Sequence, residues 1–243
     1  MTARAIARTL VVAVGLAVVG VGAGLLLVLG VLFIAAAAGV EMTPLRTIAV
    51  SLVFATGLGF GGVALMYLRL RGLSVAYVGL ARPSRTDALA VGAGYVSALL
   101  LVGAAGAVLM RTDTEAAPNT AAQAGLADPS VLVLLLVASL VIIGPGEELL
   151  FRGIVQRRLR EALPAVAAIP LASIIFAAIH YLSLAGAPEA RVVSISVLVL
   201  PTLVFGVVYE LTENLVVPAL THGLYNATLF GLLYLTVTVD LPM

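Results

Sequence analysis

The stretch Leu10–Val40, LVVAVGLAVVGVGAGLLLVLGVLFIAAAAGV, contains no charged residue. A helix needs about 20 consecutive apolar residues to cross the hydrocarbon core of a bilayer, and this stretch is longer than that. Arg4 and Arg8 precede it, as basic residues precede the apolar part of a secretory signal peptide, but the run is too long for a signal peptide. We therefore expect an uncleaved first transmembrane helix here, or a helical hairpin within the same run.

The composition extends this interpretation to the rest of the chain. Of the 243 residues, 62% are hydrophobic and 10% are charged, whereas soluble domains are about half apolar and a quarter charged. Backbone polar groups cannot stay unpaired in hydrocarbon, so the spans should be helices. We predict an all-α fold, a polytopic transmembrane bundle of seven or eight helices that forms a single integral membrane domain over residues 1–243. The further spans are expected at Thr47–Leu68, Thr86–Met110, Ser130–Gln156, Pro164–Leu184, Val192–Tyr209 and Leu215–Thr236.

Several chemistries are excluded by the residues that the sequence lacks. The chain has no cysteine, which excludes thiol catalysis, Cys-ligated zinc, iron–sulfur clusters and disulfides. A net charge of +1 gives no reason to expect nucleic acid as a partner. The expected partners are the lipid bilayer and a membrane-associated peptide or protein; the sequence defines no oligomeric state.

The arginines predict how the helices are oriented. If the N-terminus is cytoplasmic, three arginines fall outside (Arg46, Arg111 and Arg191) and ten fall inside. An excess of basic residues on the cytoplasmic side is the usual pattern of membrane proteins. We therefore expect a multi-pass protein of the cell membrane with a cytoplasmic N-terminus, and a long outer loop at residues 111–129. The ten inner arginines are Arg4, Arg8, Arg69, Arg71, Arg82, Arg85, Arg152, Arg157, Arg158 and Arg160.

Four ionisable residues lie inside the apolar spans, where such groups are costly and usually face a functional cavity. They are the only two histidines, His180 and His222, and the neighbouring Glu147 and Glu148. Glu147 and His180 are each about 16 residues from the turn at Leu163-Pro164, so an antiparallel hairpin brings them level. Glu147 and His222 also lie about 15 Å and 14 Å from charged residues that end their helices, at 1.5 Å per residue. We expect these groups at one depth, on the cytoplasmic side of the midplane.

Helical spacing pairs the polar residues further. Glu148 and Arg152 are four residues apart and can form an ion pair on one face. Glu147 then points about 100° away from Glu148, toward a cavity. The pairs Phe176 with His180 and His222 with Asn226 have the same spacing, so each pair shares a helical face.

Three short motifs in these spans resemble those of a known family. Residues 147–152, EELLFR, are similar to the EExxxR motif of the CAAX protease and bacteriocin-processing membrane family. Residues 176–180, FAAIH, resemble its FxxxH motif, and residues 222–226, HGLYN, its HxxxN motif. The resemblance covers a catalytic core at residues 130–236, whereas the N-terminal transmembrane helices at 1–110 resemble the family only in being hydrophobic.

The resemblance implies an intramembrane endopeptidase. The family includes CAAX prenyl endopeptidases, which remove the last three residues of prenylated proteins from the cytoplasmic side, as well as bacteriocin-immunity relatives and scaffolds. It implies a catalytic cavity within the C-terminal four helices that opens toward the cytoplasm. By position, Glu147 would be the catalytic glutamate, His180 would help it to bind and activate water, and His222 and Asn226 would stabilise the oxyanion. Supporting positions would be Glu148, Arg152 and Phe176.

The residue types fit that chemistry. A carboxylate in a poorly hydrated cavity suits a general base, and an imidazole can hold the attacking water. The resemblance implies a glutamate mechanism without a metal or cofactor. Zinc remains a minority alternative, because two histidines and a glutamate form a known catalytic ligand set, although the HExxH pattern is absent. Serine catalysis is disfavoured, since Ser173 and Ser183 suit helix packing and no GxSxG occurs.

Two non-catalytic functions compete with the peptidase. One is a membrane scaffold or bacteriocin-immunity protein that keeps the family fold. The other is a proton- or ion-coupled carrier, because intramembrane Glu and His form proton relays. The carrier is disfavoured because the sequence shows no inverted repeat.

Overall fold

The computed structural model describes residues 2–239, which contain helices and no strand. Seven helical segments are long and apolar enough to cross a membrane. This confirms the polytopic all-α bundle. The first apolar run is one continuous helix, α1 (Ala3–Ala37), so the described chain has no hairpin there and the alternative of an eighth span is wrong. The other six spans are Pro44–Leu70, Arg85–Arg111, Pro129–Arg160, Ala165–Ser183, Pro188–Thr212 and Val216–Thr238.

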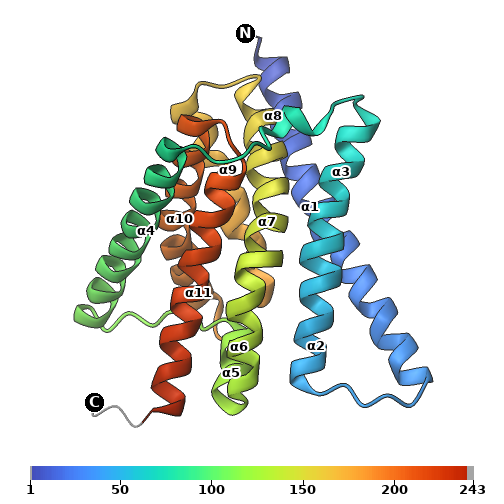
Figure 1. Cartoon of the computed structure of the whole chain (residues 1–243), viewed down its shortest axis with the longest axis vertical. Coiled ribbons are helices and arrows are strands. Elements are labelled where there is room, and N and C mark those ends of the chain that lie inside the picture. The colour runs from blue at the N-terminus through green and yellow to red at the C-terminus, as the bar shows by residue number, and fades with distance from the viewer. Residues whose placement is uncertain (1, 240–243) are drawn as a thin grey trace.

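Several of these spans are built from consecutive helical pieces, so the labels of Figure 1 subdivide them. The second span consists of α2 (Pro44–Ser51), the π-helical η1 (Leu52–Phe60) and α3 (Gly61–Leu70). The fourth consists of α6 (Pro129–Ala138), η3 (Ser139–Ile143), α7 (Gly144–Glu148), η4 (Leu149–Gln156) and α8 (Arg157–Arg160). The remaining elements are η2 (Val75–Val78), α4 (Arg85–Arg111), α5 (Thr120–Ala127), α9 (Ala165–Ile179), η5 (His180–Ser183), α10 (Pro188–Thr212) and α11 (Val216–Thr238).

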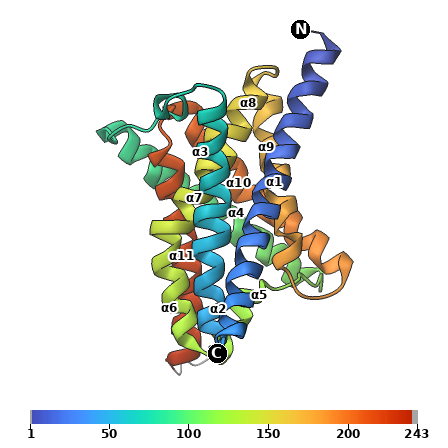
Figure 2. The same ribbon diagram turned by 90° about the vertical axis from the view of Figure 1, so that its right-hand side faces the viewer.

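The spans alternate in direction, so the chain begins at one end of the bundle, called the N-terminal end here, and α11 ends at the other (Figure 1). Helix α11 lies centrally and packs against α4, α6, α7 and α10. Helix α1 packs against η1, η4 and α9, then slants away from the rest of the bundle toward its C-terminal end (Figure 1). Figure 2 shows its N-terminal end standing apart from the other helices.

The long connection at residues 111–129, expected as a loop, contains the short helix α5. The Asn119 side chain caps it by accepting hydrogen bonds from the backbone N–H groups of Ala121 and Ala122, at 2.9 and 3.2 Å. Such a cap satisfies donors that the first helical turn leaves unpaired. The segment before it is held by a backbone hydrogen bond from Ala117 to Ala190. This connection is therefore an ordered cover at the end of the bundle opposite the N-terminus.

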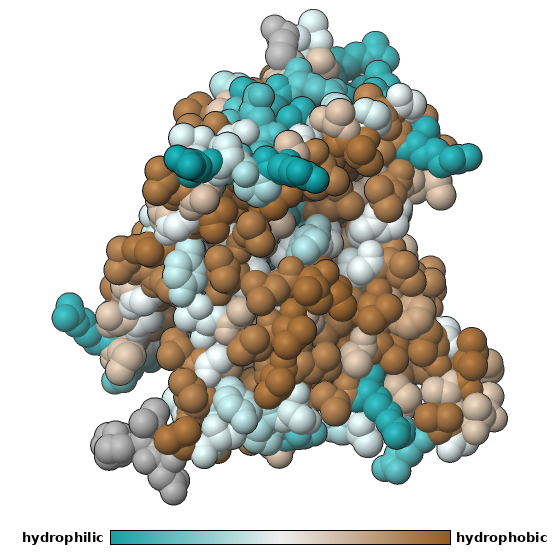
Figure 3. Space-filling model, viewed as in Figure 1, coloured by the Kyte–Doolittle hydropathy of each residue, from teal (hydrophilic) through white to brown (hydrophobic). Residues whose placement is uncertain are grey.

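The outer surface is what a bilayer requires. Large apolar side chains point outward along the spans, as with Leu26 and Phe33, which are 73% and 75% exposed. Figure 3 shows a hydrophobic band between two more hydrophilic ends. Without water at that depth, such side chains are stable only against lipid. The chain is a multi-pass integral membrane protein.

The two ends differ in charge, with one correction to the sequence analysis. Arg152, assigned there to the inner face, is fully buried within the bundle. Nine arginines and four carboxylates lie at the N-terminal end, against three arginines and five described carboxylates at the opposite end. We call these the arginine-rich and arginine-poor ends.

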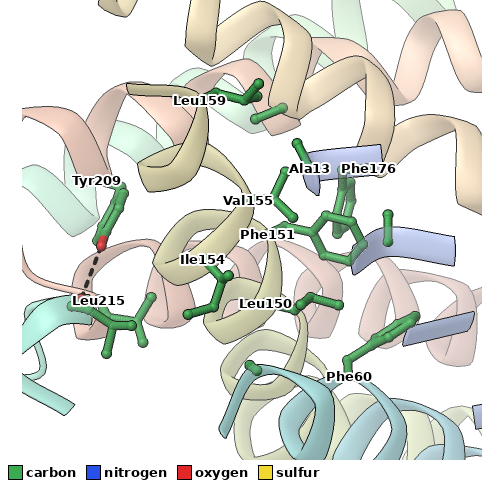
Figure 4. Packing of buried hydrophobic residues seen from close by; sticks show 14 of the residues in the cluster. Ala13, Phe60, Leu150, Phe151, Ile154, Val155, Leu159, Phe176, Tyr209 and Leu215 are labelled. Atoms are coloured by element: carbon green, nitrogen blue, oxygen red, sulfur yellow. Dashed lines mark hydrogen bonds between the residues drawn. The ribbon is translucent and has the colours of Figure 1, made fainter. Parts of the chain in front are cut away.

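The main hydrophobic cluster lies between the glutamates and the arginine-rich end. Phe151 meets Phe60 and Phe176 edge to face, with ring centroids 5.7 and 4.8 Å apart (Figure 4). Leu150, Ile154, Val155 and Leu159 are fully buried beside them. Edge-to-face pairs add to the stability that burial provides. This half of the bundle is closely packed.

Close helix contacts depend on small residues in the first two spans. A Cβ at Gly24 would lie 2.9 Å from the Ala55 Cα, and one at Gly59 would lie 2.7 Å from the Gly24 Cα. Small residues allow helix backbones to approach in membranes. Glycine at these positions therefore sets the crossing of α1 over η1.

Candidate active site

The fourth span is irregular where it carries the two glutamates. Helix α7, with Glu147 and Glu148, lies between the π-helical turns η3 and η4. Pro145 has no N–H group and so cannot continue an α-helical hydrogen-bond ladder. π-Helical turns are rare and often occur at functional sites. The π-helical turns η3 and η4 therefore rotate α7, with its two glutamates, relative to the α-helical parts of the same span.

Two glycines bring α7 against α11. A Cβ at Gly144 would lie 2.5 Å from the Ala219 carbonyl oxygen, and one at Gly223 would lie 2.8 Å from the Ser139 carbonyl oxygen. Any larger residue would separate the two helices. This crossing is what lets Glu148 reach His222.

Glu148 is the centre of a buried polar network. Its Oε2 accepts a hydrogen bond from Arg152 Nε at 2.8 Å, and its Oε1 lies 2.9 Å from His222 Nδ1. The side chains of Glu148 and Arg152 are 0% exposed. The i,i+4 ion pair expected from the sequence is therefore present, but the second contact of Glu148, with His222, was not foreseen. Because the paired carboxylate only accepts, His222 Nδ1 donates to it.

That tautomer determines whether Nε2, the other ring nitrogen of His222, donates or accepts a hydrogen bond. A neutral imidazole that donates from Nδ1 accepts at Nε2. Asn226 Nδ2 lies 2.9 Å from this Nε2 and donates to it. The second N–H of the same amide stays available to another acceptor. The ring is also stacked on Phe205, with centroids 4.7 Å apart and planes inclined by 18°.

His180 lies where α9 gives way to the 3₁₀ turn η5. Its Nδ1 is 2.9 Å from the Phe176 carbonyl oxygen, so Nδ1 donates and Nε2 is left as an acceptor. The Phe176 ring contacts both imidazoles, with centroids 4.8 Å from His180 and 5.9 Å from His222. Phe176 also lies 5.4 Å under the Arg152 guanidinium. The Phe176 ring therefore lies between His180, His222 and Arg152 and keeps them apart.

Glu147 points away from the buried network into a cavity of about 760 Å³. Its Oε2 is 3.9 Å from His222 Nε2, and its side chain is 9% exposed. His180 and Asn226 line the same cavity. The three spans thus bring Glu147, His180 and Asn226 to one chamber, with His222 directly behind Asn226.

The cavity was expected within the C-terminal four helices, but residues outside these helices also line it. Those helices supply the polar groups, but α1, α2 and η1 form the facing wall, through residues such as Val21, Leu25, Ile48 and Thr56. Helix α5 supplies further lining residues at its first turns. The first two spans are therefore part of the site.

The cavity also extends in the direction opposite to the one expected. Its opening was expected at the same end as the N-terminus. Its lining instead runs to Met42, Pro44, Thr120 and Leu182, which lie at the arginine-poor end. Toward the arginine-rich end the packed cluster around Phe151 closes it. The two expectations of a cytoplasmic N-terminus and a cytoplasmic opening contradict each other in this structure.

Other residues of the site carry no signal in the sequence. Phe205 and Gly223 act only through packing, and the chain has 24 glycines. For zinc, the described residues contain no group of three or more His, Asp or Glu side chains arranged to hold a metal ion. His222 uses both ring nitrogens in the contacts above, and His180 uses Nδ1, so only His180 Nε2 and Glu147 face the cavity as uncommitted ligands.

Comparison with protein families gives an independent result. Residues 129–228 match the family described as type II CAAX prenyl endopeptidase Rce1-like. Comparisons with curated proteins and with solved structures gave no match. The matched residues contain all three motifs, and the family is a protease family. Residues 129–228 therefore form an Rce1-like domain with the fold of a CAAX-type intramembrane protease, in agreement with the CAAX protease and bacteriocin-processing family that the motifs resemble.

Proposed function

We propose that this protein is an intramembrane endopeptidase in which Glu147 activates a water molecule to hydrolyse a peptide bond of a membrane-associated substrate. The observation that carries the proposal is the meeting of Glu147, His180 and Asn226 in one cavity, with His222 Nε2 3.9 Å from Glu147. Peptide hydrolysis requires a base for water, a donor for the oxyanion and a proton for the leaving amine. Each requirement has a residue of the right type here.

The chemical step follows from the orientation of these groups. His180 Nε2 accepts a hydrogen bond from the water and holds it, while Glu147 takes the second proton as the water oxygen bonds to the carbonyl carbon. The resulting oxyanion accepts a hydrogen bond from the free N–H of Asn226. Glu147 then gives its proton to the amide nitrogen as the carbon–nitrogen bond breaks. Atoms and charge balance, and Glu147 returns to its carboxylate form.

The hydrogen bonds support a different role for His222 from the one that the motif resemblance implies. With Nδ1 donating to Glu148 and Nε2 accepting from Asn226, a neutral His222 has no N–H left for the oxyanion. In this proposal it holds the Asn226 amide in place. The chain of contacts from Arg152 through Glu148 and His222 thereby fixes the one donor that meets the substrate. Preorganised donors of this kind dominate many enzymatic rate enhancements.

Cleavage by the purified protein in detergent tests the proposal. Two substrates of equal length would be used, a farnesylated CaaX-type peptide and an apolar amidated peptide. Glu147→Gln should lower the rate by about 10²–10⁴-fold, the usual contribution of a general base. Glu189→Gln is the matched control, because Glu189 is exposed and lies outside the cavity. It should cleave as the unmodified chain does.

Addition of a chelator separates the glutamate mechanism from the zinc alternative. Activity that is retained with chelator supports the glutamate mechanism. Activity that is lost with chelator and regained with zinc overturns it. If the unmodified chain cleaves neither peptide although it remains folded, the non-catalytic scaffold or immunity function replaces the peptidase.

A further inference from the structure

The path by which a substrate reaches Glu147 is restricted by packing on one side. Between Glu147 and the arginine-rich end, η4 contributes Leu150, Phe151, Ile154 and Val155, each 0% exposed. Beyond them Leu159 is also fully buried. An interior packed in this way holds few voids as large as a water molecule. The described structure therefore offers a peptide no route to Glu147 from that end.

The other end of the cavity reaches the surface. Its lining includes Leu25, Thr120 and Leu182, of which Leu25 is 53% and Leu182 71% exposed. These residues come from α1, α5 and η5, and the connection between α1 and α2 adds Met42. We call the gap between these four residues the mouth. It lies at the arginine-poor end, and Leu25 places part of it at membrane depth.

Charge assigns that end to one side of the membrane. The arginine-rich end carries nine arginines, against three at the end with the mouth, once the buried Arg152 is left out. Basic residues in short connections stay on the cytoplasmic side, and carboxylates contribute little to this choice. The mouth therefore faces the outside.

The lining of the cavity defines the chemistry of its occupant. Its residues are mostly aliphatic, with a few hydroxyls such as Thr47 and Ser51. No arginine lines it, the chain has no lysine, and Glu147 is its one carboxylate among the described residues. A free C-terminal carboxylate close to the scissile bond would find no arginine or lysine to balance it and would be repelled by Glu147. An uncharged apolar segment meets neither difficulty.

We infer that the substrate is an apolar peptide segment anchored in the outer leaflet, which enters through the mouth from the extracytoplasmic side. This inference rests on the proposed function, since it names the substrate class and the access route of the same site. It separates this chain from a protease that takes the charged C-terminus of a cytoplasmic protein.

The absence of cysteine from the natural chain allows a direct test of which side the mouth faces. Thr120→Cys marks the mouth, Ala116→Cys is a second marker in the exposed segment before it, and Ala81→Cys marks the arginine-rich end. A membrane-impermeant maleimide added to intact cells should modify the first two variants and leave Ala81→Cys unmodified until the cells are permeabilised. Modification of Ala81→Cys in intact cells, alone or together with the other two, would overturn the inference.

Blocking the mouth tests whether it is the route of entry. A bulky maleimide on the purified Thr120→Cys protein should remove most of the cleavage of an apolar amidated peptide, compared with the same variant before modification. The same reagent on Ala81→Cys should change nothing. Full activity after complete modification of Thr120→Cys would show that substrates enter elsewhere.

Sided membrane vesicles test the substrate itself. A lipid-anchored apolar peptide added to right-side-out vesicles should be cleaved, whereas the same peptide added to inside-out vesicles should not. The reverse result overturns the inference and leaves the peptidase standing. Cleavage that persists in vesicles with Glu147→Gln instead overturns the proposed function, and the labelling pattern of the cysteine variants is unaffected by that failure.

Discussion

On one side of Glu147, η4 is enclosed by α1, α3 and α9, and its one aromatic residue, Phe151, packs edge to face against Phe60 and Phe176. On the other side α1 slants away (Figure 1), and a cavity of about 760 Å³ lies where the equivalent packing would be. Both halves are built from the same apolar residue types. The difference teaches that apolar residues alone do not decide where the bundle is packed: one half holds the buried Glu148–Arg152 pair in place, and the other leaves a space beside Glu147.

The largest effect is expected from the ion pair at the boundary between the halves. Arg152→Met leaves the Glu148 carboxylate buried without its partner, which should cost about 3–5 kcal/mol of stability and abolish cleavage. The double variant Arg152→Met with Glu148→Gln removes both charges. It should regain much of the stability without regaining activity. Thermal unfolding in detergent and peptide cleavage measure the two quantities; a stable Arg152→Met protein would contradict the assignment.

The two halves should respond differently to loss of apolar side chains. Phe151→Ala removes a fully buried ring and should destabilise the protein by about 3–5 kcal/mol. Leu182→Ala, at the mouth, should change stability by less than about 0.5 kcal/mol because Leu182 is 71% exposed. Chemical or thermal unfolding of both variants gives the comparison. Equal losses would mean that the cavity half is packed as tightly as the other.

Asn226 tests the donor in the cavity without disturbing the packed half. Asn226→Ala should lower kcat by about 10²–10³-fold, which is what one oxyanion donor typically contributes. KM and the unfolding temperature should change little. Thr236→Ala is the control on the same helix, because Thr236 is exposed and bonds only to the backbone of Leu233 among the described residues. An unchanged kcat in Asn226→Ala would remove Asn226 from the chemical step.

The smallest effect on the rate of cleavage is expected from the ring that supports His222. Phe205→Leu keeps an apolar residue but removes the aromatic face that is stacked on His222. The imidazole should then be held less firmly, and so should the Asn226 amide that is hydrogen-bonded to it. We expect kcat to fall about tenfold, or about 1.4 kcal/mol, with KM unchanged. Phe205→Tyr keeps the aromatic ring and should therefore retain most of the rate. A change confined to KM would show that Phe205 acts on substrate binding instead.

Much of the fold and the polar part of the site could be predicted from the sequence. The spans stand out because each connection is more polar than the helices, and Glu147, His180 and His222 stand out because ionisable residues are rare at membrane depth. The spacing of Glu148 and Arg152 also gave their ion pair.

The rest of the site depends on packing that hydropathy does not record. In a chain that is 62% hydrophobic, Phe205 and the lining residues of α1 and η1 look like any other residue of a span. Counting residues along the helices predicted that Glu147, His180 and His222 lie near one another, but the end from which Glu147 is reached depends on where α1 leaves the bundle. That departure is set by contacts at Gly24 and Gly59. Gly24 follows Gly20 by four residues, a spacing that indicates close helix packing, but the spacing does not say which helix is the partner.

The π-helical turns on either side of α7 have a consequence for how such a site changes over time. A π turn accommodates one residue more than an α turn, so a single-residue insertion can be absorbed within it instead of rotating the whole helix. The fourth span is thereby divided into sections whose faces are set separately. Its ends can continue to match lipid and neighbouring helices while the five residues of α7 turn toward a new partner. One codon gained in η3 together with one lost in η4 would thus turn the glutamates by about 100° and leave both ends of the span as they are.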